Sequence, residues 1–236
     1  MQIRRETLGT QVYNLLRDRI LHGEVAGDTR LAQGPLSNEI GISRIPIRDA
    51  LKRLESDGLV TCDEIGRYTV VPFRLQDADE VYAIRRRLEP FAVGLAVRVM
   101  TSEALSVIEE HFAALGNAER SRQLDRYIEL NIKFHMAIYE ASGMGRLVRI
   151  IRGLYVGVPP LTPIMLEGRL SRSQREHEEI MRLLMARDES GAAAAMDRHI
   201  RNAGAELRKT MAAAAELRRH TSAPARGTKD HGQESD

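Results

Sequence analysis

Three histidines in the second half of the chain have side chains that could bind a metal ion together. His135, His177 and His199 lie in separate segments with helical apolar spacing, and Asn131 precedes His135 by four residues, on one helix face. Three imidazoles converging inside a helical bundle can bind Zn, Ni, Co or Mn when an oxygen ligand and water complete the shell. Spacing alone leaves open that each is an ordinary hydrogen-bonded core or surface histidine.

A second group of reactive side chains, near residue 50, is basic. Arg44, Arg48 and Lys52 are four residues apart, and Arg48 and Lys52 share one face of a predicted helix, which also carries Arg53. A recognition helix presents such cations to the major groove, where Arg48, and Arg44 from the preceding turn, suit bidentate contacts with guanine. Ser43 and Lys52 suit phosphate contacts. The alternative is an ordinary solvated helix face.

The elements around these cations have the order of a winged helix-turn-helix. Apolar spacing and turn residues predict helices over 6–21, 35–40 and 46–57, and hairpin strands over 58–62 and 68–71. The third helix begins around Pro46. The hairpin turn carries Gly66 and Arg67, and the guanidinium there suits a phosphate or the minor groove.

After residue 73 the sequence predicts helices only. They span 77–100, 102–118, 123–141, 145–156, 171–187 and 190–219. We therefore expect a mostly α fold, with the winged helix-turn-helix as a DNA-binding domain over 1–73 and an all-α bundle over 74–220. Residues 221–236 are polar and lack periodicity, which predicts a disordered tail.

Composition narrows the function classes without choosing one. The 236 residues carry 35 Lys and Arg against 33 Asp and Glu, and residues 1–73 carry ten of each sign, so net charge does not indicate nucleic acid. The single cysteine, Cys62, excludes an internal disulfide and fits a reducing compartment. No apolar run reaches the roughly 18 residues that cross a bilayer, and the start lacks a secretory signal. We expect a soluble cytoplasmic protein without a membrane partner.

The recognition segment resembles a known family. The stretch GISRIPIRDALKRLESDGLV at 41–60, with Gly66-Arg67 after it, is similar to that of the GntR regulators, in which G-[VI]-S-R-x-P-[VI]-R-x-A-L recurs. The resemblance implies that Arg44, Arg48, Arg53 and Arg67 contact double-stranded DNA and that Pro46 starts the recognition helix. Two departures precede it: the chain has Ala26-Gly27 where the family often has Pro-Gly, and Gly34-Pro35 in place of an acidic helix start.

The second half resembles the FCD effector domain of the FadR subgroup. The motifs are Leu88-Glu89-Pro90, Asn131-x-x-Phe134-His135, Glu176-His177 and Met196-x-x-His199. In metal-binding members an Asp and three His hold a divalent cation, and the matching residues here are Asn131, His135, His177 and His199. Asn131 is a departure, because a neutral amide oxygen is a poorer ligand than carboxylate for a hard dication. We expect Zn, Ni or Mn, bound more weakly and together with an anionic effector.

Two further residues are predicted to bind the effector. Arg85 matches an arginine that faces a carboxylate effector in similar proteins, and guanidinium suits that role through two parallel hydrogen bonds. The alternative is that Arg85, Arg86 and Arg87 form a solvated basic run. Asn202 follows His199 by about one helical turn and could add a polar contact to the same ligand.

These expectations combine into a regulator that works by population shift. A symmetric homodimer would place two wings about one DNA turn apart on a pseudo-palindromic operator, and a small carboxylate would favour one domain arrangement. We favour a repressor, whose effector binds the DNA-incompetent arrangement better; an activator would reverse this preference, and the sequence does not decide between the two. One alternative is a metal-dependent enzyme using the three-His site, although no motif ties a base or nucleophile to it. Another is a DNA-architectural protein without an effector.

Overall fold

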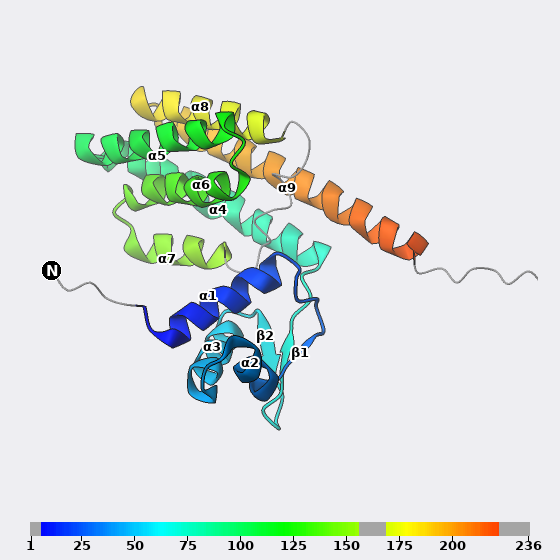
Figure 1. Ribbon diagram of the computed structural model, residues 1–236. Helices are drawn as coiled ribbons and strands as arrows, with labels where there is room; N and C mark the ends of the chain where they lie inside the picture. Colours follow the sequence, from blue (N-terminus) through cyan, green and yellow to red (C-terminus); the bar gives the residue numbers. More distant parts are fainter. Residues whose placement is uncertain (1–5, 156–168, 222–236) are drawn as a thin grey trace, which may run out of the picture.

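The chain folds into two groups of elements that follow one another in the sequence. In the computed structural model, residues 6–155 and 169–221 are described (Figure 1). The predicted disordered tail lies outside these residues apart from Thr221. Helices dominate the described part, which confirms the mostly α fold. None of its helices combines the length and apolar character needed to cross a bilayer.

The N-terminal unit consists of three helices and a small antiparallel sheet. Its helices are α1 (Leu8–Leu21), α2 (Gln33–Ile40) and α3 (Arg44–Ser56), and its strands are β1 (Arg30–Leu31), β2 (Val60–Cys62) and β3 (Tyr68–Val70). Thr7 caps α1, because its hydroxyl accepts a hydrogen bond from the Thr10 amide at 3.2 Å. Apolar residues of all three helices and the sheet form one core, with Leu16, Ile47 and Leu54 almost fully buried. The order of elements confirms the winged helix-turn-helix.

Two details of this unit differ from the sequence prediction. The wing is a three-stranded sheet in the order β1-β3-β2, because Arg30 and Leu31 pair with Thr69 and Tyr68. A two-residue strand has no periodicity of its own, so only its partner reveals it. Pro46 does not start the recognition helix: α3 begins at Arg44, and α2 begins at Gln33, ahead of Pro35. Both prolines are third in their helices, where the amide hydrogen that proline lacks has no partner within the helix.

Glycines with positive φ make two turns of this unit, one just before the recognition helix and one at the tip of the wing. Gly41 has a φ of 75° and ends α2, and its amide donates to the Ser37 carbonyl. Gly66 has a φ of 79° at the tip between β2 and β3. This left-handed region is readily accessible only to glycine, so both turns depend on it.

The described residues of the C-terminal unit form a bundle of six helices. They are α4 (Leu75–Val99), α5 (Ser102–Arg120), α6 (Leu124–Glu140), α7 (Gly145–Leu154), α8 (Arg169–Met185) and α9 (Glu189–Thr221). The predicted helix over 145–156 therefore ends earlier among the described residues, at Leu154. Figure 1 shows α9 as the longest helix, with its C-terminal half extending past the other helices. The predicted boundary between residues 73 and 74 lies just before α4.

The bundle core surrounds an unusual set of polar side chains. Helices α4 and α9 pack closely, and a Cβ at Gly204 would lie 2.7 Å from the Tyr82 ring, so glycine is needed for this approach. Large apolar and aromatic side chains such as Phe134, Ile138 and Ile180 fill the interior. Glu89, His135 and His177 are buried among them, each at most 1% exposed. Polar groups so deeply buried require specific partners, so this region is a candidate functional site.

Candidate DNA-binding face and buried histidine site

The recognition helix has a basic face opposite its buried stripe. Because α3 begins at Arg44, the residues Arg44, Arg48 and Lys52 occupy successive turns of one helix, and all three are exposed. The opposite face is buried against the core; it consists of Ile47, Ala50, Leu51 and Leu54. Helix α3 thus presents a column of cations to solvent, with Arg44 in its first turn rather than in the preceding loop.

The other predicted residues of this helix lie at its two ends. Ser43 is exposed at the position before α3, and Pro46 lies in its first turn. Arg53 lies near the far end and stacks on the ring of Tyr13, 3.9 Å from its centroid. The Tyr13 hydroxyl in turn donates to the Asp57 carboxylate. Arg53 therefore also ties α3 to α1, a role that the sequence motif did not indicate.

The wing presents a single arginine at a turn organised by Asp63. The Asp63 carboxylate accepts hydrogen bonds from the Ile65 and Arg67 amides at 3.1 and 2.9 Å, and it also pairs with the Arg67 side chain. Both side chains are exposed, and an exposed ion pair contributes little energy. Arg67 can therefore exchange this carboxylate for a phosphate at small cost, with Gly66 beside it.

Two exposed isoleucines on the same unit were not singled out by sequence reasoning. Ile45 in the first turn of α3 is 63% exposed, and Ile65 at the wing tip is 73% exposed. Apolar side chains at such positions can contact the methyl group of thymine. Neither isoleucine continues an apolar helical or strand pattern, so periodicity gave no signal for them.

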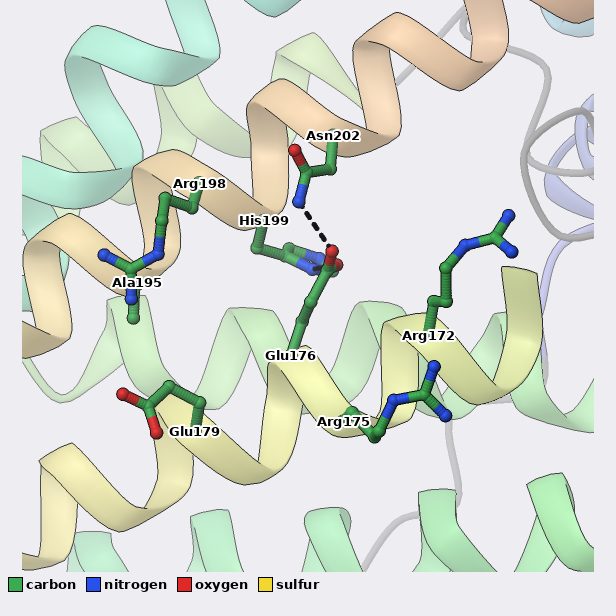
Figure 2. Close-up of a pocket in the computed structure, with 8 residues that line it drawn as sticks. All are labelled: Arg172, Arg175, Glu176, Glu179, Ala195, Arg198, His199 and Asn202. Atoms are coloured by element: carbon green, nitrogen blue, oxygen red, sulfur yellow. Dashed lines mark hydrogen bonds and ion pairs between the residues drawn. The ribbon is translucent and has the colours of Figure 1, made fainter. Parts of the chain in front are cut away.

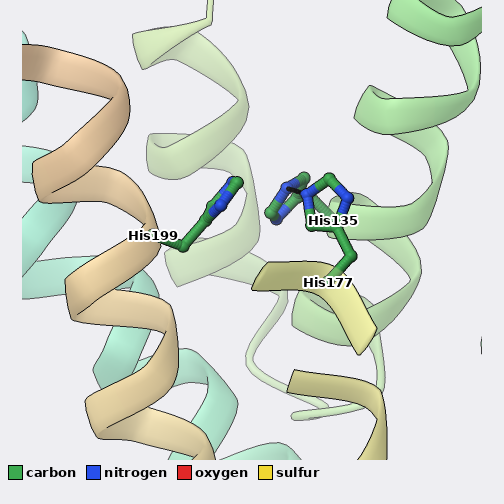
Figure 3. Close-up of side chains that lie close together, drawn as sticks. All are labelled: His135, His177 and His199. Carbon is green, nitrogen blue, oxygen red and sulfur yellow. Dashed lines mark hydrogen bonds between the residues drawn. The ribbon is translucent and has the colours of Figure 1, made fainter. Parts of the chain in front are cut away.

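Three histidines from three different helices meet inside the bundle. His135 on α6, His177 on α8 and His199 on α9 each offer a ring nitrogen, and these atoms lie within 4.8 Å of one another (Figure 3). The Nε2 atoms of His135 and His177 are 3.2 Å apart. Two imidazole nitrogens bound to one tetrahedral zinc at 2.0–2.1 Å would be about 3.3 Å apart. The His135–His177 pair is therefore at the distance that two ligands of one cation would have.

The outer ring nitrogens of the cluster have hydrogen-bond partners. His199 Nδ1 lies 2.7 Å from the Glu176 carboxylate, and a carboxylate accepts the proton of that nitrogen. His135 Nδ1 lies 3.2 Å from the Tyr139 hydroxyl, whereas the contact of His177 Nδ1 with Tyr127 is longer, at 3.5 Å. Partners of this kind orient histidines that bind metals.

Burial keeps the cluster uncharged. Loss of solvation lowers the pKa of His135 and of His177 well below the ordinary value of 6.5, and the neighbouring His199 lowers both further. Burial also lowers the pKa of His199, although its contact with Glu176 opposes the shift. Neutral imidazole is the form that binds metal ions, so all three rings are in that form at neutral pH.

Asn131, the predicted oxygen ligand, has a buried side-chain oxygen. It lies one turn before His135 on α6, and its Oδ1 atom is buried with no hydrogen-bond partner among the described residues. A buried acceptor without a partner is costly, and it is commonly satisfied by water or an ion. Three neutral imidazoles and one free amide oxygen form a donor set that fits Zn, Ni or Mn.

Arg85 lies inside the bundle and not in a solvated run. Its guanidinium contacts Glu89 at 2.6 Å and donates to the Tyr155 hydroxyl at 2.9 Å, while Arg86 next to it pairs with Asp197 at the surface. The Arg85 guanidinium also lies over the Tyr155 ring. The buried arginine is thus neutralised by an acid of its own helix, and an effector carboxylate would have to compete with Glu89.

Asn202 lines a groove on the outer side of the cluster. The groove has a volume of about 300 Å³ between α8 and α9, and His199 and Glu176 form part of its wall (Figure 2). The Asn202 amide donates to Glu176 at 2.8 Å. Three arginines also line it: Arg172, Arg175 and Arg198. Arg85 is not among its lining residues, so the two predicted effector contacts belong to different surroundings.

The partners of the site residues were missed at the sequence level. Glu89, Tyr139 and Glu176 were not among the predicted site residues, although each contacts one that was. Glu89 follows Arg85 by four residues and Tyr139 follows His135 by four, which places each pair on one helix face. That spacing could have indicated both contacts. The approach of Glu176 to His199 joins two helices and leaves no such signal.

The fold is that of a winged helix-turn-helix unit followed by a separate helical domain. Residues 8–69 match the bacterial regulatory proteins of the gntR family, and residues 80–202 match the FCD domain. The chain belongs to the GntR family and carries an FCD domain after its DNA-binding unit. The family and its domains are therefore those of a transcriptional regulator and not those of a metal-dependent enzyme.

Individual relatives agree with this assignment. The chain is 31% identical to the HTH-type transcriptional regulator McbR of Escherichia coli over 78% of its length and 84% of that protein. The structure of E. coli McbR/YncC matches with a TM-score of 0.73 and 27% identity, over 87% of this chain and 99% of that one. The gluconate operon transcriptional repressor of Bacillus licheniformis is 24% identical over 76% of this chain and 72% of that protein.

Proposed function

We propose that this protein is a homodimeric transcriptional repressor of the FadR subgroup, released from its operator by a small carboxylate that binds beside a divalent metal ion. The observation that carries the proposal is the convergence of three buried histidines inside the FCD domain, and it is supported by an unpartnered buried oxygen on Asn131, one helical turn before His135. Repression is supported by two relatives whose names describe a gluconate operon repressor and the repressor RspR.

The DNA contacts would come from the exposed column of α3 and from the wing. Arg44 and Arg48 suit bidentate contacts with guanine, whereas Lys52 and Ser43 suit phosphates. Arg67 would bind a phosphate or the minor groove beside Gly66. Arg53 retains the contact predicted by resemblance only if it leaves the Tyr13 ring, so we expect it to contribute least.

The metal ion would be held by His135, His177, His199 and Asn131. The bound cation would supply a positive charge that attracts the effector carboxylate. The chain contributes the dry, neutral surroundings that strengthen this attraction. Arg85 would donate to the effector carboxylate the hydrogen bonds that it donates to Glu89 in this structure.

A second copy of the chain would pack against the outer face of α4. Ile84 and Phe91 are exposed there, 37% and 55%, and Leu88 and Leu95 between and beyond them are partly buried. Their spacing of four, three and four residues is that of a helix packing against another helix. Such a contact would set the distance between two recognition helices, and the effector would act by shifting the population of that arrangement.

The test combines metal content, ligand binding and DNA binding of the full chain. An operator selected from random duplexes is titrated with protein loaded with Zn, Ni or Mn, in the presence of small mono- and dicarboxylates. We expect the protein to contain one metal ion per chain. One of the carboxylates should stabilise the protein against unfolding only when that metal is bound, and operator binding should weaken when the metal and the carboxylate are both present. In His177→Asn the metal and the carboxylate effect should be lost, while operator binding remains.

Two outcomes would contradict the proposal. A wild-type protein that binds the operator but neither metal nor carboxylate would leave only a DNA-architectural role. A carboxylate that strengthens operator binding would make the protein an activator or a corepressor-dependent regulator, because the effector would then prefer the DNA-competent arrangement.

A further inference from the structure

Tyr139 joins the two halves of the buried site. Its hydroxyl donates to Glu89 Oε2, and the same oxygen lies 3.2 Å from His135 Nδ1. Glu89 comes from α4, whereas His135 and Tyr139 are one turn apart on α6. All three side chains are buried, so water does not compete for these hydrogen bonds.

The hydrogen bonds of this group leave one arrangement of protons. The Glu89 carboxylate faces the Arg85 guanidinium and, when ionised, can only accept hydrogen bonds. Tyr139 has a single hydroxyl proton, which it gives to Glu89, so its oxygen can only accept from His135. His135 must then carry its proton on Nδ1. The lone pair is left on Nε2, the atom that lies 3.2 Å from His177 Nε2.

We propose that Glu89, acting through Tyr139, holds His135 in the Nδ1–H tautomer and so keeps its Nε2 atom free to bind a metal ion. This inference rests on the proposed metal function of the histidine cluster. It makes Glu89 and Tyr139 positioning residues, because neither needs to touch the metal. Since Glu89 also pairs with Arg85, one carboxylate orients both the metal ligand and the predicted effector contact.

The cluster contains its own matched control. Tyr127 is also a buried tyrosine of α6, and its hydroxyl lies near His177 Nδ1. The distance is 3.5 Å, at the outer limit for a hydrogen bond, and Tyr127 makes no hydrogen bond to Glu89. Tyr139→Phe and Tyr127→Phe each delete one buried hydroxyl, but only the first breaks the path from Glu89 to His135.

The first measurement uses metal-free protein and is independent of metal binding. Histidine side-chain nitrogens are observed by ¹⁵N NMR at neutral pH, and His135 is assigned from the signal lost in His135→Gln. We expect wild type and Tyr127→Phe to show a protonated Nδ1 and an unprotonated Nε2. In Tyr139→Phe the Nε2–H form should appear. Wild-type His135 in the Nε2–H form, or an unchanged tautomer in Tyr139→Phe, would overturn the inference.

The second measurement is the affinity for Zn, measured by competition with a chromophoric chelator. Removing a partner that orients a ligand lowers metal affinity by about 10- to 100-fold, which we expect for Tyr139→Phe. Tyr127→Phe should lose much less. Equal losses in the two variants would contradict the path through Tyr139.

The two measurements separate this inference from the proposed function. If the tautomers behave as expected but wild type binds no metal, Glu89 orients His135 through Tyr139 as proposed, and the metal site is refuted. If wild type binds Zn and Tyr139→Phe changes neither the His135 tautomer nor the Zn affinity, the metal site is supported, and the role of Glu89 and Tyr139 is refuted.

Discussion

Replacing Glu89 by Gln should destabilise the FCD domain severely. Glu89 is fully buried and Arg85 is 8% exposed, so the substitution leaves a buried guanidinium without its counterion. Removing one partner of a buried pair costs about 3–5 kcal/mol, whereas glutamine keeps the volume and one acceptor oxygen. With a urea slope of about 2 kcal/mol per M, the unfolding midpoint should fall by roughly 1.5–2.5 M.

The neighbouring residue provides the control for this substitution. Arg86 pairs with Asp197 at the surface, where the two side chains are 42% and 30% exposed. Asp197→Asn should therefore change stability by less than about 1 kcal/mol. Both variants are followed by far-UV circular dichroism in urea, because the sequence has no tryptophan.

A double substitution keeps the test decisive even if Glu89→Gln does not fold. Arg85→Met together with Glu89→Gln removes both charges, so it should be more stable than Glu89→Gln alone. Acetate should also stabilise Glu89→Gln more than wild type, since Arg85 is then free to bind it. Equal losses in Glu89→Gln and Asp197→Asn would refute the reasoning, because they would mean that Glu89 is solvated.

Three further predictions concern DNA, pH and assembly. Arg48→Ala should weaken binding to the selected operator by about 1–3 kcal/mol in fluorescence anisotropy, and an unchanged affinity would exclude base contact by Arg48. Burial lowers the pKa of His135 and His177 below 6.5, so below that pH the unfolded chain binds more protons than the folded chain. The urea midpoint should therefore fall as the pH drops below 6.5, and a midpoint that stays constant down to about pH 5 would contradict this. Phe91→Asp should give a monomer by light scattering, whereas Val107→Asp, at an exposed apolar site on α5, should not. Dimers in both variants would remove α4 from the interface.

The sequence determined the elements whose signals are local. The apolar spacing of Ile47, Leu51 and Leu54 predicted α3 and placed Arg48 and Lys52 on its open face, because a helix repeats every 3.6 residues. The same periodicity placed Asn131 and His135 on one face of α6. The start of α3 was predicted at Pro46 but lies at Arg44, since the amide groups of the first turn make no hydrogen bonds within the helix and proline is therefore tolerated inside it. Strand β1 has two residues and exists only through its pairing with β3.

Only the tertiary structure decided how the site is built. The convergence of His135, His177 and His199 depends on the packing of three helices, and distances between separate helices are not encoded in residue spacing. Burial then lowers the pKa of these histidines, a property that no isolated helix has. The role of Glu89 is also tertiary: its spacing from Arg85 is local, but its contact with Tyr139 joins α4 to α6 inside a core from which water is excluded.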